Sequence, residues 1–142
     1  MAMLKGILSI FKGKEKEKKE SAKYLDEETV NFLVEKGYDV KYIDELMGKL
    51  PEDLRGNVIS FIKSGNYKLK DLRSGVGKKV MKGIANNKYS EETLDTVIEV
   101  YLYMKKKTVP SKSDVDAEKK KLIMKMPKSL LKKVANSYGY KI

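Results

Sequence analysis

The sequence has 142 residues, contains neither cysteine nor histidine, and carries a formal net charge of +11. Without cysteine there is no disulfide, zinc–thiolate site or thiol nucleophile, and without histidine the commonest general base and transition-metal ligand is missing. Because no other nucleophile–base pair is visible, we expect no enzymatic activity and no cofactor or metal. The length is typical of one domain, and 41% hydrophobic residues suffice for a core without disulfides.

The positive charge lies in three blocks of the chain. Residues 1–23, 51–90 and 105–142 carry +4, +6 and +9, whereas residues 24–50 and 91–104 carry −4 each. Such segregation favours oriented contact with a polyanion, either nucleic acid or an anionic membrane, although a lysine-rich solvated surface has the same composition. No stretch approaches the roughly 18 apolar residues of a membrane span. The lack of cysteine leaves the redox compartment open, and the cytoplasm is the default expectation.

Residues 1–23 combine a short amphipathic pattern with a charged run. A helical period places Leu4, Ile7, Leu8 and Phe11 on one face, and "KGKEKEKKES" follows as a solvated tether. The apolar run is too short for a signal peptide. This face is expected to meet an anionic membrane, a protein partner or the chain's own core, and the sequence leaves these three open.

Residues 24–107 are predicted to form a helical core domain. Each predicted helix begins at a capping residue or proline and contains apolar residues at a helical period. The predicted helices run from Asp26 to Gly37, from Asp39 to Gly48, from Pro51 to Gly65, around Leu69 up to Gly75, around Val80 to Ala85, and from Ser90 onward. No strand is predicted, so the expected fold is all-α, a small multi-helix bundle.

Residues 108–142 are predicted to form a basic C-terminal helical segment. Pro110 breaks the chain, Ser113 or Asp114 opens one helix, and Pro127 starts another. Lysines and tyrosines in this segment suit phosphate neutralisation and base stacking, although its aliphatic spacing suits core packing equally well. The candidate nucleic-acid contacts here are Lys119, Lys120, Lys121, Lys132 and Lys133.

The centre of the chain places "YKLKDLRSG" and "GKKVMKGIANN" directly before the serine-led "YSEETLDTVIEVYL". With "LRGNVISFIKSG" as the preceding helix, this order resembles the λ-repressor-like (XRE) helix-turn-helix family over about residues 54–103. The resemblance implies DNA binding, with "GKKVMKGIANN" as the recognition helix. The sequence differs from the family at Arg73, where a small alanine is usual. Gly83 is expected to weaken the recognition helix by about 1 kcal/mol relative to alanine.

In that recognition helix, the outward positions are Lys78, Lys79, Lys82, Asn86 and Asn87. Lysines are expected to contact phosphates, whereas an asparagine amide can pair with the edge of adenine. The neighbouring basic candidates are Lys68, Lys70, Arg73 and Lys88. Because arginine is scarce, contact is expected to be mostly phosphate-directed and sensitive to salt.

Glu91, Asp95 and Glu99 share one helical stripe, which is interpreted as a solvated acidic face rather than a cation site. The sequence as a whole predicts a small basic nucleic-acid-binding protein, either a DNA-binding regulator or a nucleoid or virion component of a mobile element. The alternative is a non-enzymatic protein-interaction or membrane-surface adaptor built from short helices. Homo-oligomerisation is compatible with both.

Overall fold

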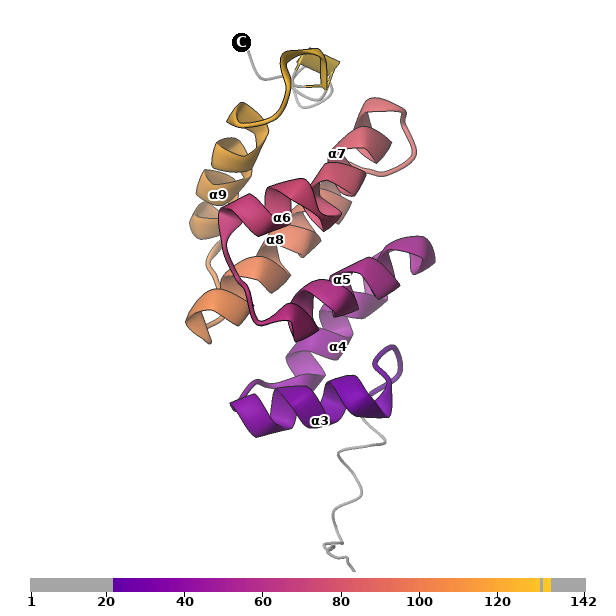
Figure 1. Cartoon of the computed structure of the whole chain (residues 1–142), viewed down its shortest axis with the longest axis vertical. Coiled ribbons are helices and arrows are strands. Elements are labelled where there is room, and N and C mark those ends of the chain that lie inside the picture. The colour runs from indigo at the N-terminus through magenta and orange to yellow at the C-terminus, as the bar shows by residue number, and fades with distance from the viewer. Residues whose placement is uncertain (1–21, 131, 134–142) are drawn as a thin grey trace, which may run out of the picture. The chain divides into compact units, whose positions relative to one another are not determined.

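The computed structural model describes residues 22–130, 132 and 133, and this part of the chain is helical, without a strand. Helices α3 to α9 lie within it (Figure 1), so the predicted all-α fold class is confirmed. None of these helices combines the length and the apolar character that crossing a bilayer requires. The chain divides into two compact units after Gly48, inside the range predicted as one core domain.

The first unit contains α3 (Glu27–Lys36) and α4 (Val40–Gly48). As predicted, α3 begins after Asp26 and ends at Gly37, whose φ of 84° is the left-handed conformation that favours glycine. Apolar side chains on one stripe of each helix are buried because the helical period aligns them. These buried side chains are Val30, Leu33, Ile43, Leu46 and Met47.

A buried carboxylate ties the chain before α3 to α4. Asp44 is 6% exposed, and its Oδ1 accepts hydrogen bonds from the backbone N–H groups of Lys23 and Tyr24 at 3.0 and 2.8 Å. Its Oδ2 accepts a second bond from the Lys23 N–H at 2.9 Å. The Tyr24 ring covers Gly48, where an added Cβ would lie 2.8 Å from the ring. A carboxylate and a glycine thus fix residues 23 and 24 against α4.

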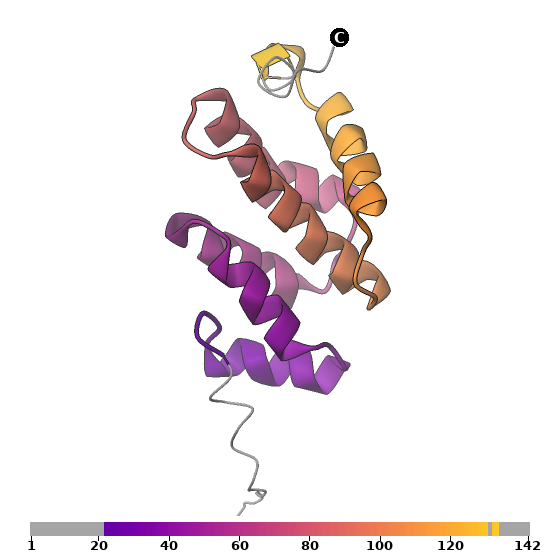
Figure 2. The same ribbon diagram turned by 180° about the vertical axis from the view of Figure 1, so that it is seen from behind.

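The second unit is built around α8. It contains α5 (Glu52–Ser64), α6 (Leu69–Ser74), α7 (Val76–Ala85), α8 (Glu91–Lys106) and α9 (Lys112–Met124). α8 contacts both α7 and α9, and α9 runs alongside it in both views (Figures 1 and 2). Leu94, Ile98 and Tyr101 of α8 are fully buried. This helix therefore supplies the main apolar surface on which its neighbours pack.

Two helix starts differ from the sequence prediction. Pro51 is the residue before α5 rather than a residue of its first turn. α9 is capped by Ser111, not by Ser113 or Asp114. The Ser111 Oγ accepts from the Asp114 N–H at 3.1 Å, and the Asp114 Oδ2 accepts from the Ser111 N–H at 3.2 Å. This reciprocal capping box satisfies two terminal N–H groups, which explains why the helix starts earlier than predicted.

A single residue, Gly75, joins α6 to α7. Its N–H donates to the Asp71 carbonyl at 3.1 Å, and its carbonyl accepts from the Lys78 N–H at 3.1 Å, so it closes one helix and opens the next. A helix-turn-helix unit usually has a turn of three or four residues. The joint here is tighter, and the resemblance to the helix-turn-helix family stays a prediction.

Candidate nucleic-acid interface

The lysines of α7 point in two directions. On one flank, the Lys79 Nζ donates to the Asp53 carbonyl at 3.2 Å and to the Asn57 Oδ1 at 2.8 Å, both on α5. Beyond the end of α7, the Lys88 Nζ lies 3.0 Å from the Asp53 Oδ2, to which the Tyr89 hydroxyl donates at 2.7 Å. Lys79 and Lys88, both predicted to contact nucleic acid, are thus engaged with α5. We call this group of five residues the Asp53 cluster.

The titration of the Asp53 cluster follows from these contacts. Hydrogen bonds from Tyr89 and Lys88 hold the pKa of the Asp53 carboxyl below its ordinary value. The hydrogen bond to Asp53 raises the pKa of Lys88. Burial, together with the bond to Asp53, raises the pKa of the Tyr89 hydroxyl. At neutral pH the carboxylate and the ammonium are therefore both charged while the phenol stays a hydrogen-bond donor.

Gly83 has a packing role that the sequence did not reveal. Tyr89 is 8% exposed, and its ring lies directly against the α7 backbone at Gly83. A Cβ at position 83 would lie 2.0 Å from the Tyr89 Cδ2. Glycine thus allows the ring to approach α7 closely enough for its hydroxyl to reach Asp53. The expected weakening of α7 is offset by this close packing.

The other flank of α7 faces a pocket of about 430 Å³. Its opposite wall comes from the segment that begins at Pro127, in which residues 128–130, 132 and 133 are helical. The pocket, which we call the basic pocket, is lined by Lys78, Lys82, Ala85, Asn86, Pro127, Ser129, Leu130 and Lys133. Four of these residues were predicted from the sequence as nucleic-acid contacts, namely Lys78, Lys82, Asn86 and Lys133.

Lys78 and Lys82 are the strongest candidates for binding an anion. Both side chains are exposed, and neither forms an ion pair with any residue in the part of the chain that the structure describes. Positions i and i+4 lie on one face of a helix about 6 Å apart along its axis. Asn86 continues the same stripe one turn further and adds an amide that can both donate and accept.

Lys119 is not available for nucleic acid, contrary to the sequence prediction. It is 3% exposed, and its Nζ lies 2.8 Å from both the Glu91 Oε2 and the Asp95 Oδ1 of α8. Burial alone would lower the pKa of Lys119, but the bonds to Asp95 and Glu91 outweigh it and raise the pKa. Asp116 on its own helix is 3.8 Å away. Two members of the stripe predicted as a solvated acidic face, Glu91 and Asp95, therefore hold α9 against α8 through Lys119.

The remaining predicted residues are not brought to the basic pocket. Lys121 pairs with Glu118 at 3.4 Å, and Arg73 is half-buried on α6. Asn87 has a φ of 62° beyond the end of α7. The other lysines are exposed just before α6, on α6, on α9 or in the last helical residues: Lys68, Lys70, Lys120 and Lys132. The predicted membrane or partner residues Leu4, Ile7, Leu8 and Phe11 lie outside the described residues.

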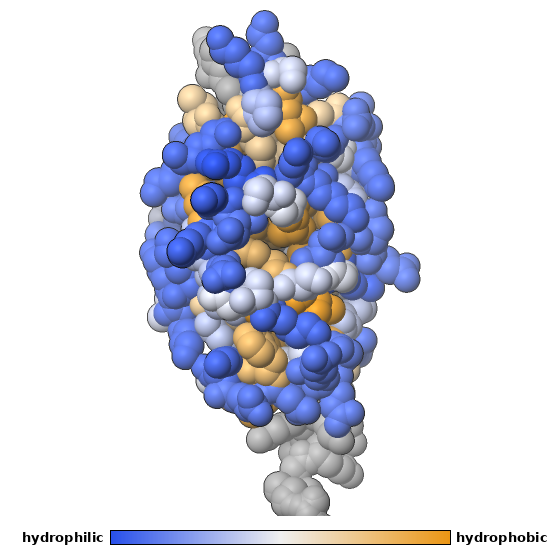
Figure 3. All heavy atoms as spheres, viewed as in Figure 1, coloured by the Kyte–Doolittle hydropathy of each residue, from blue (hydrophilic) through white to orange (hydrophobic). Residues whose placement is uncertain are grey.

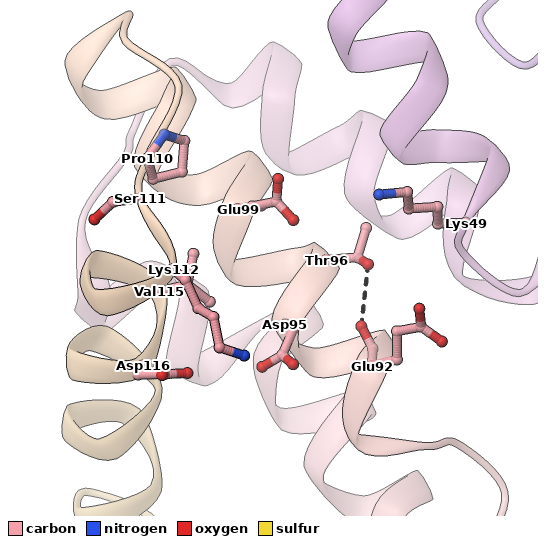
Figure 4. A pocket seen from close by; sticks show the side chains of 10 residues that line it. All are labelled: Lys49, Glu92, Asp95, Thr96, Glu99, Pro110, Ser111, Lys112, Val115 and Asp116. Carbon is pink, nitrogen blue, oxygen red and sulfur yellow. Dashed lines mark hydrogen bonds between the residues drawn. The ribbon is translucent and has the colours of Figure 1, made fainter.

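A second pocket, of about 310 Å³, has a different character. Figure 4 shows the carboxylates of Glu92, Asp95 and Glu99 on α8 and of Asp116 on α9 around this pocket, together with Lys49 and Lys112. The Thr96 hydroxyl donates to the Glu92 carbonyl at 3.0 Å, so this polar group is turned to its own helix. With four carboxylates and two lysines among its ten lining residues, this pocket attracts phosphate less than the basic pocket does. The basic pocket is the better anion site.

The basic pocket is a candidate site because of its geometry and not because of similarity to known proteins. Figure 3 shows hydrophilic residues over most of the visible face, with apolar residues in small areas between them. Comparison with protein-family models, with characterised proteins and with solved structures gave no match to the chain. The uncharged lining residues Ala85, Ser129 and Leu130 were not predicted from the sequence. Pro127, a predicted helix start, was the available signal for that wall.

Proposed function

We propose that this protein binds nucleic acid, with the phosphates held at the basic pocket. The observation that carries the proposal is the convergence of Lys78, Lys82 and Asn86 with Lys133, which is distant in sequence. Convergent ammonium groups at an open pocket attract phosphate and release counterions when a nucleic acid binds. The net charge of +11 adds long-range attraction of the same sign.

A DNA-binding regulator, or a nucleoid or virion component of a mobile element, is the role that we propose for this activity. The resemblance of residues 54–103 to the λ-repressor-like helix-turn-helix family supports it, since α7, the helix that would correspond to that family's DNA-contacting helix, carries the lysines proposed to contact phosphate. The proposal involves no catalysis, because it needs phosphate contact alone. Among exposed lysines, the pair on α7 is the best placed to give that contact.

The proposal is tested by fluorescence anisotropy with labelled oligonucleotides and the full-length chain, at salt concentrations from about 50 to 200 mM. Replacing Lys78 or Lys82 by alanine removes one phosphate contact each. Each variant should lower the slope of log affinity against log salt by about 0.9 for a duplex and about 0.7 for a single strand. Lys41→Ala is the matched control, since Lys41 is an exposed lysine on α4 outside the pocket.

Vesicles that contain an anionic lipid serve as a second binding probe in the same experiment and distinguish the membrane-surface alternative. Vesicle binding without oligonucleotide binding would refute the proposal and favour an adaptor that uses its N-terminal segment. Equal slopes for wild type, Lys78→Ala and Lys82→Ala, with oligonucleotide binding intact, would show that the basic pocket is not the site.

A further inference from the structure

The lysine stripe of α7 is one wall of a pocket rather than a freely exposed helix face. Lys78, Lys82 and Asn86 line the basic pocket together with Pro127, Ser129, Leu130 and Lys133 on its other side. A recognition helix that reads duplex DNA presents its outward side chains directly to the base edges. In this chain the same side chains face a second segment, which begins at Pro127, across the basic pocket.

The second wall of the pocket argues against insertion of this face of α7 into a DNA groove. An α-helix with its side chains is about 10–12 Å across, and the major groove of B-DNA is about 12 Å wide. The groove therefore accommodates one helix. Pro127, Ser129 and Leu130 lie across the pocket from α7, so a second wall occupies the space beside this face of the helix that a groove would have to enclose. We therefore expect a duplex to meet only the rim of the pocket.

A single strand is not limited in this way. Its nucleotides are flexible, and an unpaired base can turn away from its neighbours into a pocket. The volume of about 430 Å³ lies in the range of small-molecule pockets. The lysines suit the phosphate, and Ala85 and Leu130 give apolar surface for the sugar and base. Asn86 and Ser129 can hydrogen-bond a base edge.

We propose that the basic pocket takes one nucleotide of a single-stranded nucleic acid, with its phosphate between Lys78 and Lys82 and its base against the Pro127–Leu130 wall. This inference rests on the proposed function and names its substrate class. No aromatic side chain lines the pocket among the described residues, so the base is held by aliphatic contact rather than by stacking. Preference among the four bases is therefore weak.

The test compares three labelled probes of one sequence: a deoxyribonucleotide strand, a ribonucleotide strand and the DNA duplex. Ala85→Leu fills the pocket without changing its charge, and leucine is a good helix former. This variant should weaken binding of the single strand by about tenfold, and binding of the duplex, which meets only the rim of the pocket, by less. Ser129→Leu on the opposite wall is the second filling variant, for the case that Ala85→Leu does not fold by circular dichroism.

The outcomes separate this inference from the proposed function. The inference is supported if either single strand binds more tightly than the duplex and this difference is lost in the filling variants. Comparison of the two single strands shows whether a ribose hydroxyl contributes. Tighter duplex binding overturns the inference and leaves the proposed function standing. Tight single-strand binding that neither filling variant weakens overturns the assignment to this pocket. Failure of all three probes to bind removes the proposed function and this inference together.

Discussion

Replacing Gly83 by alanine should destabilise the protein, although the same change in most helices is stabilising. In an exposed helix interior, alanine is more stable than glycine by about 1 kcal/mol. Here the new Cβ would lie 2.0 Å from the Tyr89 Cδ2 and 2.3 Å from its Cε2, distances that no packed side chain tolerates. The Tyr89 ring must move away from α7, and its hydroxyl then loses the 2.7 Å bond to Asp53.

The expected magnitude combines three terms. Overpacking in a well-packed site costs about 1–3 kcal/mol. Loss of the Tyr89–Asp53 hydrogen bond adds about 0.5–1.5 kcal/mol. The higher helix propensity of alanine relative to glycine offsets about 1 kcal/mol of this loss. The free energy of unfolding should therefore fall by about 0.5–3.5 kcal/mol in Gly83→Ala.

The measurement is urea denaturation followed by circular dichroism, with the midpoint and slope fitted for each variant. A Tyr89→Ala background removes the ring, so in that background Gly83→Ala should raise stability by about 1 kcal/mol. The change of sign between the two backgrounds is the signature of this packing. A stabilising effect of Gly83→Ala in the wild-type chain, or the same sign in both backgrounds, would refute the reasoning.

Three further variants test the other contacts by the same denaturation assay. Lys119→Met should lower stability by about 1–3 kcal/mol, because the buried Asp95 Oδ1 loses its cation. Since folding raises the pKa of Lys119, the contribution of Lys119 to the free energy of unfolding is complete below about pH 10.4 and declines as the pH rises further. The Lys119→Met variant should lack that decline. Ser111→Ala removes the α9 capping box and should cost about 0.5–2 kcal/mol, whereas Ser113→Ala should cost little. Asp44→Ala leaves the Lys23 and Tyr24 N–H groups without their acceptor and should cost about 1–3 kcal/mol; an unchanged midpoint would contradict this anchoring role.

The helices could be predicted because their signals are local. Gly37 and Gly65 end α3 and α5 in the left-handed conformation, and Ser90 precedes α8 at the predicted place. The start of α9 was misplaced because several candidate caps follow one another from Ser111. The reciprocal bonds between Ser111 and Asp114 decide among them, and those bonds depend on local geometry rather than on composition.

The candidate site was only partly predictable, because charge alone does not say which lysine is already paired. Lys78 and Lys79 are adjacent in sequence, yet one lines the basic pocket and the other contacts α5. Lys119 looked like its neighbour Lys120 until the packing of α9 on α8 placed it between two carboxylates. These differences arise from contacts between residues distant in sequence, which a helical period cannot specify.

The burial of Lys119 also separates this amine chemically from the lysines on the surface. Acylating reagents attack the neutral amine, and a lysine that is 3% exposed with a raised pKa offers almost none of that form. Mild acetylation would therefore remove surface charges one after another while sparing the ammonium between Glu91 and Asp95. The positive charge of this protein can thus be reduced in graded steps without breaking the link between α8 and α9.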